Sequence, residues 1–148
     1  MKNKINAWRL ILAGILFAVI AEIIHILSAL LSMKYYTMPE YFSVWSKVMM
    51  PSAGPPPASF YYYSFVFAAV TGIILAYMYS VLRKSLEAKS AAARGVRYGM
   101  VLFFVSIIPF SLSLYLLINL PLALIFVWAA ENLVLYILGG MVIAKLNK

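Results

Sequence analysis

The sequence predicts an all-α integral membrane protein, an up-down bundle of four helices that forms a single transmembrane domain over residues 1–148. Composition is the first evidence, because 66% of the 148 residues are hydrophobic and only 11% are charged. Soluble domains have roughly 45–50% apolar and ~25% charged residues. The second evidence is that the apolar residues are gathered into four runs. Each run is long enough to cross a hydrocarbon core of ~30 Å as one helix.

Composition also excludes several classes of site. The chain has no cysteine and no aspartate, and it has a single histidine. Disulfides, thiolate metal sites and cysteine nucleophiles are therefore excluded. Neither a catalytic set nor a metal site is predicted, and the sequence indicates no particular cofactor. The net charge of +8 comes mainly from cationic residues at the ends of the apolar runs, which favours contact with membrane lipids carrying anionic headgroups and not with nucleic acid.

The four apolar runs predict membrane spans at residues 10–31, 60–82, 98–118 and 122–144. Of the twelve Lys and Arg residues, only Lys34 and Lys47 lie in the first or third connection. The other ten lie in the terminal segments and around the second connection. Because cytoplasmic segments carry the excess of positive charge, we expect a multipass protein of the cytoplasmic membrane with both termini in the cytoplasm.

The first connection, residues 32–59, is the only long one. Thr37 and Glu40 have the spacing of a capping box, and Pro39 is tolerated in a first helical turn. The apolar pattern of residues 38–49 predicts a short amphipathic helix lying on the outer leaflet. Its interfacial aromatic residues are Tyr41, Phe42 and Trp45. An anchor in the interface is the simpler interpretation, and a lid or a docking surface for a partner is the alternative.

The third connection consists of Asn119, Leu120 and Pro121. A link this short predicts that the third and fourth spans form an antiparallel hairpin. Asn119 is expected to cap the last helix and Pro121 to lie in its first turn.

Two stripes of small residues predict close helix packing. In the second span small residues recur every four positions, at Ser64, Ala68, Gly72, Ala76 and Ser80. The first span has a shorter stripe of Gly14 and Ala18, which continues to Glu22. Small residues let helices approach closely in lipid. Contact between the two stripes would place Glu22 inside the bundle, and homodimerisation is the alternative use of either stripe.

Unusual residues of all four spans are predicted to lie at one depth. Glu22, Thr71, Pro109 and Glu131 are each about ten to thirteen residues from the outer end of their span, which corresponds to roughly 15–20 Å along a helix. Pro109 also leaves the carbonyl of Val105 without its helical donor, so that Ser106 or a ligand could bond to it. The candidate ligand or proton site therefore comprises Glu22, His25, Thr71, Ser106, Pro109 and Glu131.

Carboxylates inside a membrane span are a functional-site hypothesis, because each costs at least ~2.5–3.5 kcal/mol to insert. His25 follows Glu22 by three residues and so lies on the same helix face. One interpretation is a proton shared among Glu22, His25 and Glu131. The structural alternative is that Glu22 and His25 satisfy each other, while a neutral Glu131 bonds to a Ser, a Tyr or Asn132. A di-metal centre needs two Glu-x-x-His motifs, and the chain has one.

From Arg94 onward the sequence resembles a family of small four-span prokaryotic membrane proteins that has no assigned activity. The matching features are Arg94-Gly95-Val96-Arg97-Tyr98-Gly99, Pro109, Trp128, Glu131 and the pair Gly139-Gly140. This resemblance implies the fold only. Separately, Ala21-Glu22 in a first span is similar to the small multidrug resistance transporters, which implies an intramembrane glutamate with a role in transport.

Three classes of function are compatible with these features. The leading hypothesis is a non-enzymatic membrane protein, either an accessory subunit of a membrane complex or a small-ligand-binding module, with a partner membrane protein or a second copy of the chain in contact with its stripes. The second is a proton- or cation-coupled transporter of a small solute, in which Glu22 and Glu131 titrate and His25 tunes them. The third is a membrane enzyme acting on a lipid or quinone, for which no nucleophile or phosphate-binding loop is present.

Overall fold

The structure is a computed structural model that describes residues 6–52 and 54–147. The described residues form helices and connections, without strands. The helices are α1 (Ala7–Tyr36), the 3-10 helix η1 (Pro39–Val44), α2 (Ala58–Leu82), α3 (Ala91–Leu102), the π-helical turn η2 (Phe103–Ile107), α4 (Ile108–Leu117) and α5 (Leu122–Leu146). Because α3, η2 and α4 are continuous, four helices are long and apolar enough to cross a membrane. The prediction of an all-α chain with four helices long and apolar enough to cross a membrane is confirmed.

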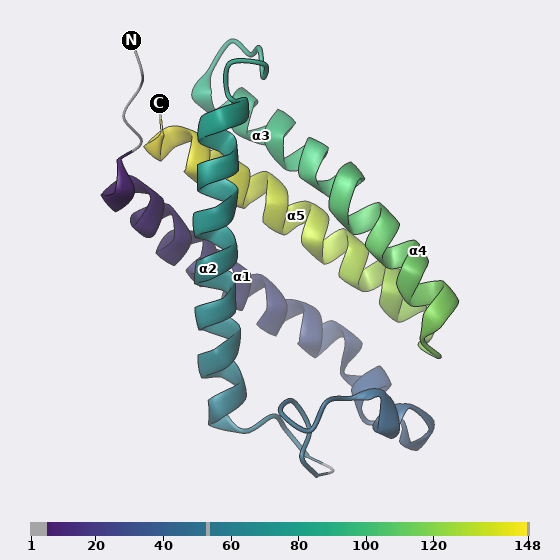
Figure 1. Cartoon of the computed structure of the whole chain (residues 1–148). Coiled ribbons are helices and arrows are strands. Elements are labelled where there is room, and N and C mark those ends of the chain that lie inside the picture. Colours follow the sequence, from purple (N-terminus) through teal and green to yellow (C-terminus); the bar gives the residue numbers. More distant parts are fainter. Residues whose placement is uncertain (1–5, 53, 148) are drawn as a thin grey trace.

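The long helices alternate in direction (Figure 1). α1 begins, α2 ends, α3 begins and α5 ends at one end of the molecule, which we name the terminal end. The connection between α1 and α2 lies at the opposite end, which we name the connection end. The pair α3–α4 runs beside α5, whereas α2 crosses α1 at a marked angle and separates from α5 toward the connection end (Figure 1).

Glycines bring the backbones of α3 and α5 into direct contact. A Cβ atom added at Gly99 would lie 2.3 Å from the carbonyl oxygen of Tyr136, and one added at Gly95 would lie 2.5 Å from that of Gly140. Contacts under 3.0 Å leave no room for a side chain. Gly95 and Gly99 are four residues apart and thus form a small-xxx-small pair, the arrangement that permits close helix packing in membranes.

A second close contact lies where α1 crosses α2. A Cβ atom on Gly72 would come within 2.6 Å of the Phe17 Cβ and 2.9 Å of the Gly14 Cα. Ala18 and Ala76 are fully buried. Ser64 and Ala68 lie closer to the connection end, where they line a cavity. The crossing therefore uses the half of the two stripes that is nearer the terminal end.

The core lies toward the terminal end and is built around Tyr79 of α2 and Tyr98 of α3, both fully buried. Their rings meet edge to face, with centroids 5.4 Å apart. The Tyr98 hydroxyl donates a hydrogen bond of 2.7 Å to the carbonyl oxygen of Leu75. This bond connects α2 to the α3–α5 pair, and it gives the buried Tyr98 hydroxyl the partner that such groups usually have.

The capping box predicted for the first connection was wrong, and the amphipathic helix predicted over residues 38–49 is not confirmed, since only the six residues of η1 are helical there. α1 continues to Tyr36, and the Thr37 hydroxyl donates to the carbonyl oxygens of Met33 and Lys34 at its end. Thr37 therefore closes α1 and does not begin the next helix. The next element is the six-residue η1, whose N-cap is Met38 and which has no side-chain cap.

The predicted cap of the last helix was also wrong. Pro121 is the N-cap of α5 and no side chain caps this helix. The backbone N–H of Leu120 donates to the Ile118 carbonyl oxygen at 2.8 Å. This bond closes a tight turn between α4 and α5. Asn119 is consequently not positioned at the first turn of α5.

The contact at Gly99 predicts that Gly99→Val destabilises the protein much more than Ala93→Val, a substitution elsewhere in α3. Gly99→Val should lower the free energy of unfolding by about 1–3 kcal/mol, because the added atoms overlap the α5 backbone. Helix propensity alone would make the valine variant more stable than the glycine protein. A loss of stability would therefore reflect the contact with α5. Thermal unfolding in detergent, followed by circular dichroism, measures it.

Ala93→Val is the matched control, because Ala93 is exposed on the same helix. It should change the unfolding temperature little. Equal stability of the Gly99→Val and Ala93→Val proteins would contradict the packing described for α3 and α5.

Candidate functional site

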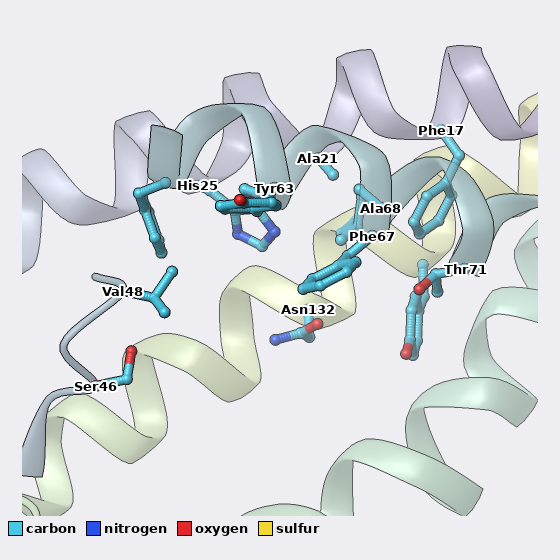
Figure 2. Close-up of a pocket in the computed structure, with 14 residues that line it drawn as sticks. Phe17, Ala21, His25, Ser46, Val48, Tyr63, Phe67, Ala68, Thr71 and Asn132 are labelled. Carbon is cyan, nitrogen blue, oxygen red and sulfur yellow. The ribbon is translucent and has the colours of Figure 1, made fainter. Parts of the chain in front are cut away.

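A cavity of about 570 Å³ lies between α1, α2 and α5. Ser46 and Val48 of the first connection border it on the side of the connection end (Figure 2). Phe60 at the start of α2 also lines it. The volume falls within the range of roughly 300–1,000 Å³ that is typical of small-molecule sites. The cavity exists because α2 and α5 separate beyond the glycine crossing of α1 and α2.

The walls of the cavity are mostly aromatic and aliphatic. They comprise Phe17, Ala21, Phe60, Tyr63, Phe67, Ala68, Leu135 and Tyr136, with the polar residues His25, Ser46, Ser64, Thr71 and Asn132 among them. The Asn132 amide donates to the Trp128 carbonyl oxygen at 2.9 Å. An apolar pocket with few polar groups is the usual composition of a site for a lipophilic molecule.

His25 of α1 and Glu131 of α5 form a direct contact between His25 Nδ1 and a Glu131 carboxyl oxygen. The Glu131 side chain is only 8% exposed, whereas that of His25 is 41% exposed, and His25 lines the cavity. The two groups share one hydrogen bond and form an ion pair when His25 is protonated. The buried carboxyl group is thus connected to the cavity through the imidazole.

Glu22 is not a member of this hydrogen bond. Its Oε1 atom is buried and has no hydrogen-bond partner among the described residues. The structure therefore brings together two of the three groups expected to share a proton, and it pairs His25 with Glu131 and not with Glu22. In residues 6–52 and 54–147 no group of three or more His, Asp or Glu side chains is arranged to hold a metal ion.

The remaining members of the sequence-predicted site are not gathered together. Thr71 lines the cavity. Ser106 and Pro109 are exposed and do not line it. The backbone around Pro109 widens into the π-helical turn η2, in which Ile108 donates to the Phe103 carbonyl oxygen. A π-helical turn is one way in which a helix accommodates a local irregularity.

An aromatic cluster closes the connection end of the α1–α5 pair. The Trp128 indole N–H donates to the Tyr36 hydroxyl at 2.9 Å. The Trp45 ring lies 5.1 Å from the Tyr36 ring and 6.3 Å from that of Trp128, measured between centroids. Of the three predicted interfacial residues, Trp45 therefore holds the connection against two helices, while Tyr41 and Phe42 are half-buried. A side-chain hydrogen bond with Glu40 raises the pKa of Tyr41.

Sequence reasoning missed most of the cavity wall. Phe60, Tyr63, Phe67 and Thr71 recur at helical spacing and so share one face of α2. This spacing was a usable signal. The contributions of Phe17, Asn132 and Tyr136 carry no comparable pattern, because they depend on how α1 and α5 are rotated about their axes.

Comparison with protein-family models, curated proteins and solved structures finds no match for this chain. The two resemblances noted from the sequence therefore stay expectations.

The His25–Glu131 contact predicts an energetic coupling that a double-mutant cycle can measure. His25→Ala and Glu131→Ala should each lower the stability by about 1–3 kcal/mol, because each leaves a partner without its bond. The double variant should lose less than the sum, with a coupling of about 0.5–3 kcal/mol. Thermal unfolding in detergent at one fixed pH provides the values.

The cycle of His25→Ala with Glu22→Ala is the control. Its coupling should be smaller, because Glu22 makes no bond to His25. A larger coupling for the Glu22 cycle would refute the pairing seen in the structure.

Proposed function

We propose that this chain is a non-enzymatic multipass membrane protein that binds a small lipophilic molecule in the cavity between α1, α2 and α5. The observation that carries the proposal is the cavity itself, which has a volume of about 570 Å³ and aromatic walls. Four helices that are long and apolar enough to cross a membrane support the multipass assignment.

The cavity favours a flat, mainly apolar ligand with one polar group. Phe17, Phe67 and Tyr136 offer ring surfaces, which contribute favourable stacking in addition to their buried area. His25 and Asn132 lie on different helices within the same cavity. Their hydrogen-bonding groups would orient the polar part of the ligand, as few placed polar groups do in such sites.

Substitution at Thr71 tests binding. Thr71→Phe puts a ring into the cavity and should weaken saturable binding of the fluorescent probe 1-aminoanthracene at least tenfold, measured by titration in detergent. The reason is that the added ring takes up part of the cavity volume. Val70→Phe is the matched control, because Val70 is exposed on the same helix and does not line the cavity.

Equal affinity of the Thr71→Phe and Val70→Phe proteins would contradict binding in this cavity. Mass spectrometry of the protein extracted from its native membrane in mild detergent would identify the bound molecule. The same measurement would reveal fixed-stoichiometry protein partners, the result expected of an accessory subunit.

The His25–Glu131 pair favours a second candidate function, a proton-coupled transporter of the same ligand. The pair lies between two helices that are long and apolar enough to cross a membrane, and His25 lines the cavity. Ionisable groups within such helices commonly mark proton or solute pathways. In this hypothesis His25 and Glu131 exchange the coupled proton, and Glu22 lies one helical turn away.

Proton-coupled transport requires that the affinity for the ligand depend on pH, because proton binding and ligand binding are then thermodynamically linked. The affinity for 1-aminoanthracene should change severalfold between pH 5 and 8, the range in which histidine side chains ordinarily change charge. His25→Gln should make the affinity constant over this range, because no histidine remains in the chain and Gln can still donate a hydrogen bond to Glu131. A flat profile for the unmodified protein would exclude the transporter hypothesis for this ligand.

A further inference from the structure

Two aromatic residues of α2 line the cavity and are at the same time strongly exposed. Phe67 is 67% exposed and Tyr63 is 49% exposed, and their rings stack with centroids 6.5 Å apart. On the opposite walls, Phe17 and Ala21 of α1 and Leu135 of α5 are buried. The cavity is therefore open along the part of α2 that carries Tyr63 and Phe67, which we name the open edge.

The open edge lies at a depth where a membrane-spanning helix meets hydrocarbon. Phe67 follows Ala58, the first residue of α2, by nine residues, which corresponds to roughly 13 Å along the helix. On this side of its crossing with α1, α2 lies away from α5 (Figure 1). Phe67 of α2 and Asn132 of α5 both line the cavity there (Figure 2). In a bilayer that these helices cross, the opening between α2 and α5 faces acyl chains and not water.

On the side of the connection end the cavity is bordered by the first connection. Ser46 and Val48 line the cavity there, and Trp45 holds this segment against Tyr36 and Trp128. A ligand that arrives from water at this end would have to pass the segment. A ligand dissolved in the bilayer meets the open edge directly.

The nitrogen-bearing side chains of the cavity lie toward the connection end. On α1 His25 is nearer that end than Phe17, and on α5 Asn132 is nearer it than Tyr136 (Figure 1). The deeper part also contains the hydroxyls of Thr71 and Tyr136, which are uncharged. An amphiphile in the leaflet that borders the connection end has a similar order, with its polar group outward and its apolar part inward. Such a molecule could move sideways into the cavity without turning over.

The lining of the cavity offers no positive charge that is free to bind an anion. No Lys, Arg, Asp or Glu is among the described residues that line it, and Lys47 of the first connection is exposed outside it. A protonated His25 paired with an ionised Glu131 has no net charge. A phosphate or sulfonate in the cavity would therefore be an uncompensated charge, which is costly away from water. A hydroxyl or carbonyl group can instead form hydrogen bonds with His25 or Asn132.

We infer, on the basis of the proposed binding function, that the cavity opens sideways into the hydrocarbon layer between α2 and α5 and binds an uncharged amphiphile dissolved in the bilayer. The hydroxyl or carbonyl group of this molecule lies at the level of His25 and Asn132. Its apolar part lies between Phe17 and Phe67, the buried and the exposed aromatic walls of the cavity.

The direction of the opening is tested with a fluorescent label, because the chain has no cysteine and one can be introduced at a chosen position. Ala68→Cys lies in the cavity wall, and the full chain is labelled there with monobromobimane and reconstituted in phosphatidylcholine liposomes. Lipids with brominated acyl chains should quench the label strongly, and iodide in the water should quench it little. Val70→Cys is the matched reference, since Val70 is exposed on the same helix outside the cavity. Ser64→Cys is a second cavity position if the first variant does not fold.

We expect brominated lipid to quench the label in the cavity at least half as strongly as the label at Val70→Cys. Weaker quenching by brominated lipid, or stronger quenching by iodide than by brominated lipid, would overturn the inference. Neither result depends on a bound ligand, so the proposed binding function would remain.

The preference for an uncharged ligand is tested by displacement of 1-aminoanthracene in detergent at neutral pH. The competitors 1-naphthol and 1-naphthalenesulfonate have the same ring system, and only the sulfonate is charged. With concentrations expressed as mole fractions in the micelle, 1-naphthol should displace the probe at least tenfold more effectively. Equal displacement by the two competitors would refute the uncharged class alone. Absence of saturable probe binding would overturn both this inference and the proposed function.

Discussion

Direct backbone contact at glycines is the constraint on which the rest of this structure depends. α3 meets α5 at Gly95, Gly99 and Gly140, and α2 meets α1 at Gly14 and Gly72. In lipid the hydrophobic effect does not drive helices together, so close packing of small residues replaces it. Because the crossing of α1 and α2 is fixed near the terminal end, the angle between these helices forces α2 away from α5 toward the connection end. The cavity is a geometric consequence of that crossing.

Toward the connection end, where α2 lies away from α5, polar contacts hold α1 and α5 together. His25 with Glu131 and Tyr36 with Trp128 join α1 to α5 in this half. A carboxyl group inside a membrane span is costly, and its pairing with an imidazole offsets part of that cost. The aromatic stacking of Trp45 on Tyr36 and Trp128 then fixes the first connection over the same two helices.

His25 lies at the junction of the two features to which we assign a function. Its ring lines the cavity, and its Nδ1 atom contacts the buried Glu131. A ligand in the cavity and a proton on the His25–Glu131 pair would therefore affect each other through one side chain.

The sequence by itself determined the four spans, because length and hydropathy are properties of each run alone. It also singled out Glu22, His25 and Glu131, since ionisable residues stand out in an apolar span. Only the tertiary structure decided that His25 pairs with Glu131, that Glu22 stays apart, and that Ser106 and Pro109 are exposed. The predicted caps at Thr37 and Asn119 were wrong because the true ends of α1 and α4 depend on packing and turn geometry. The pairing and exposure of the side chains could not be predicted, because the rotation of a helix about its axis is set by the surfaces it packs against.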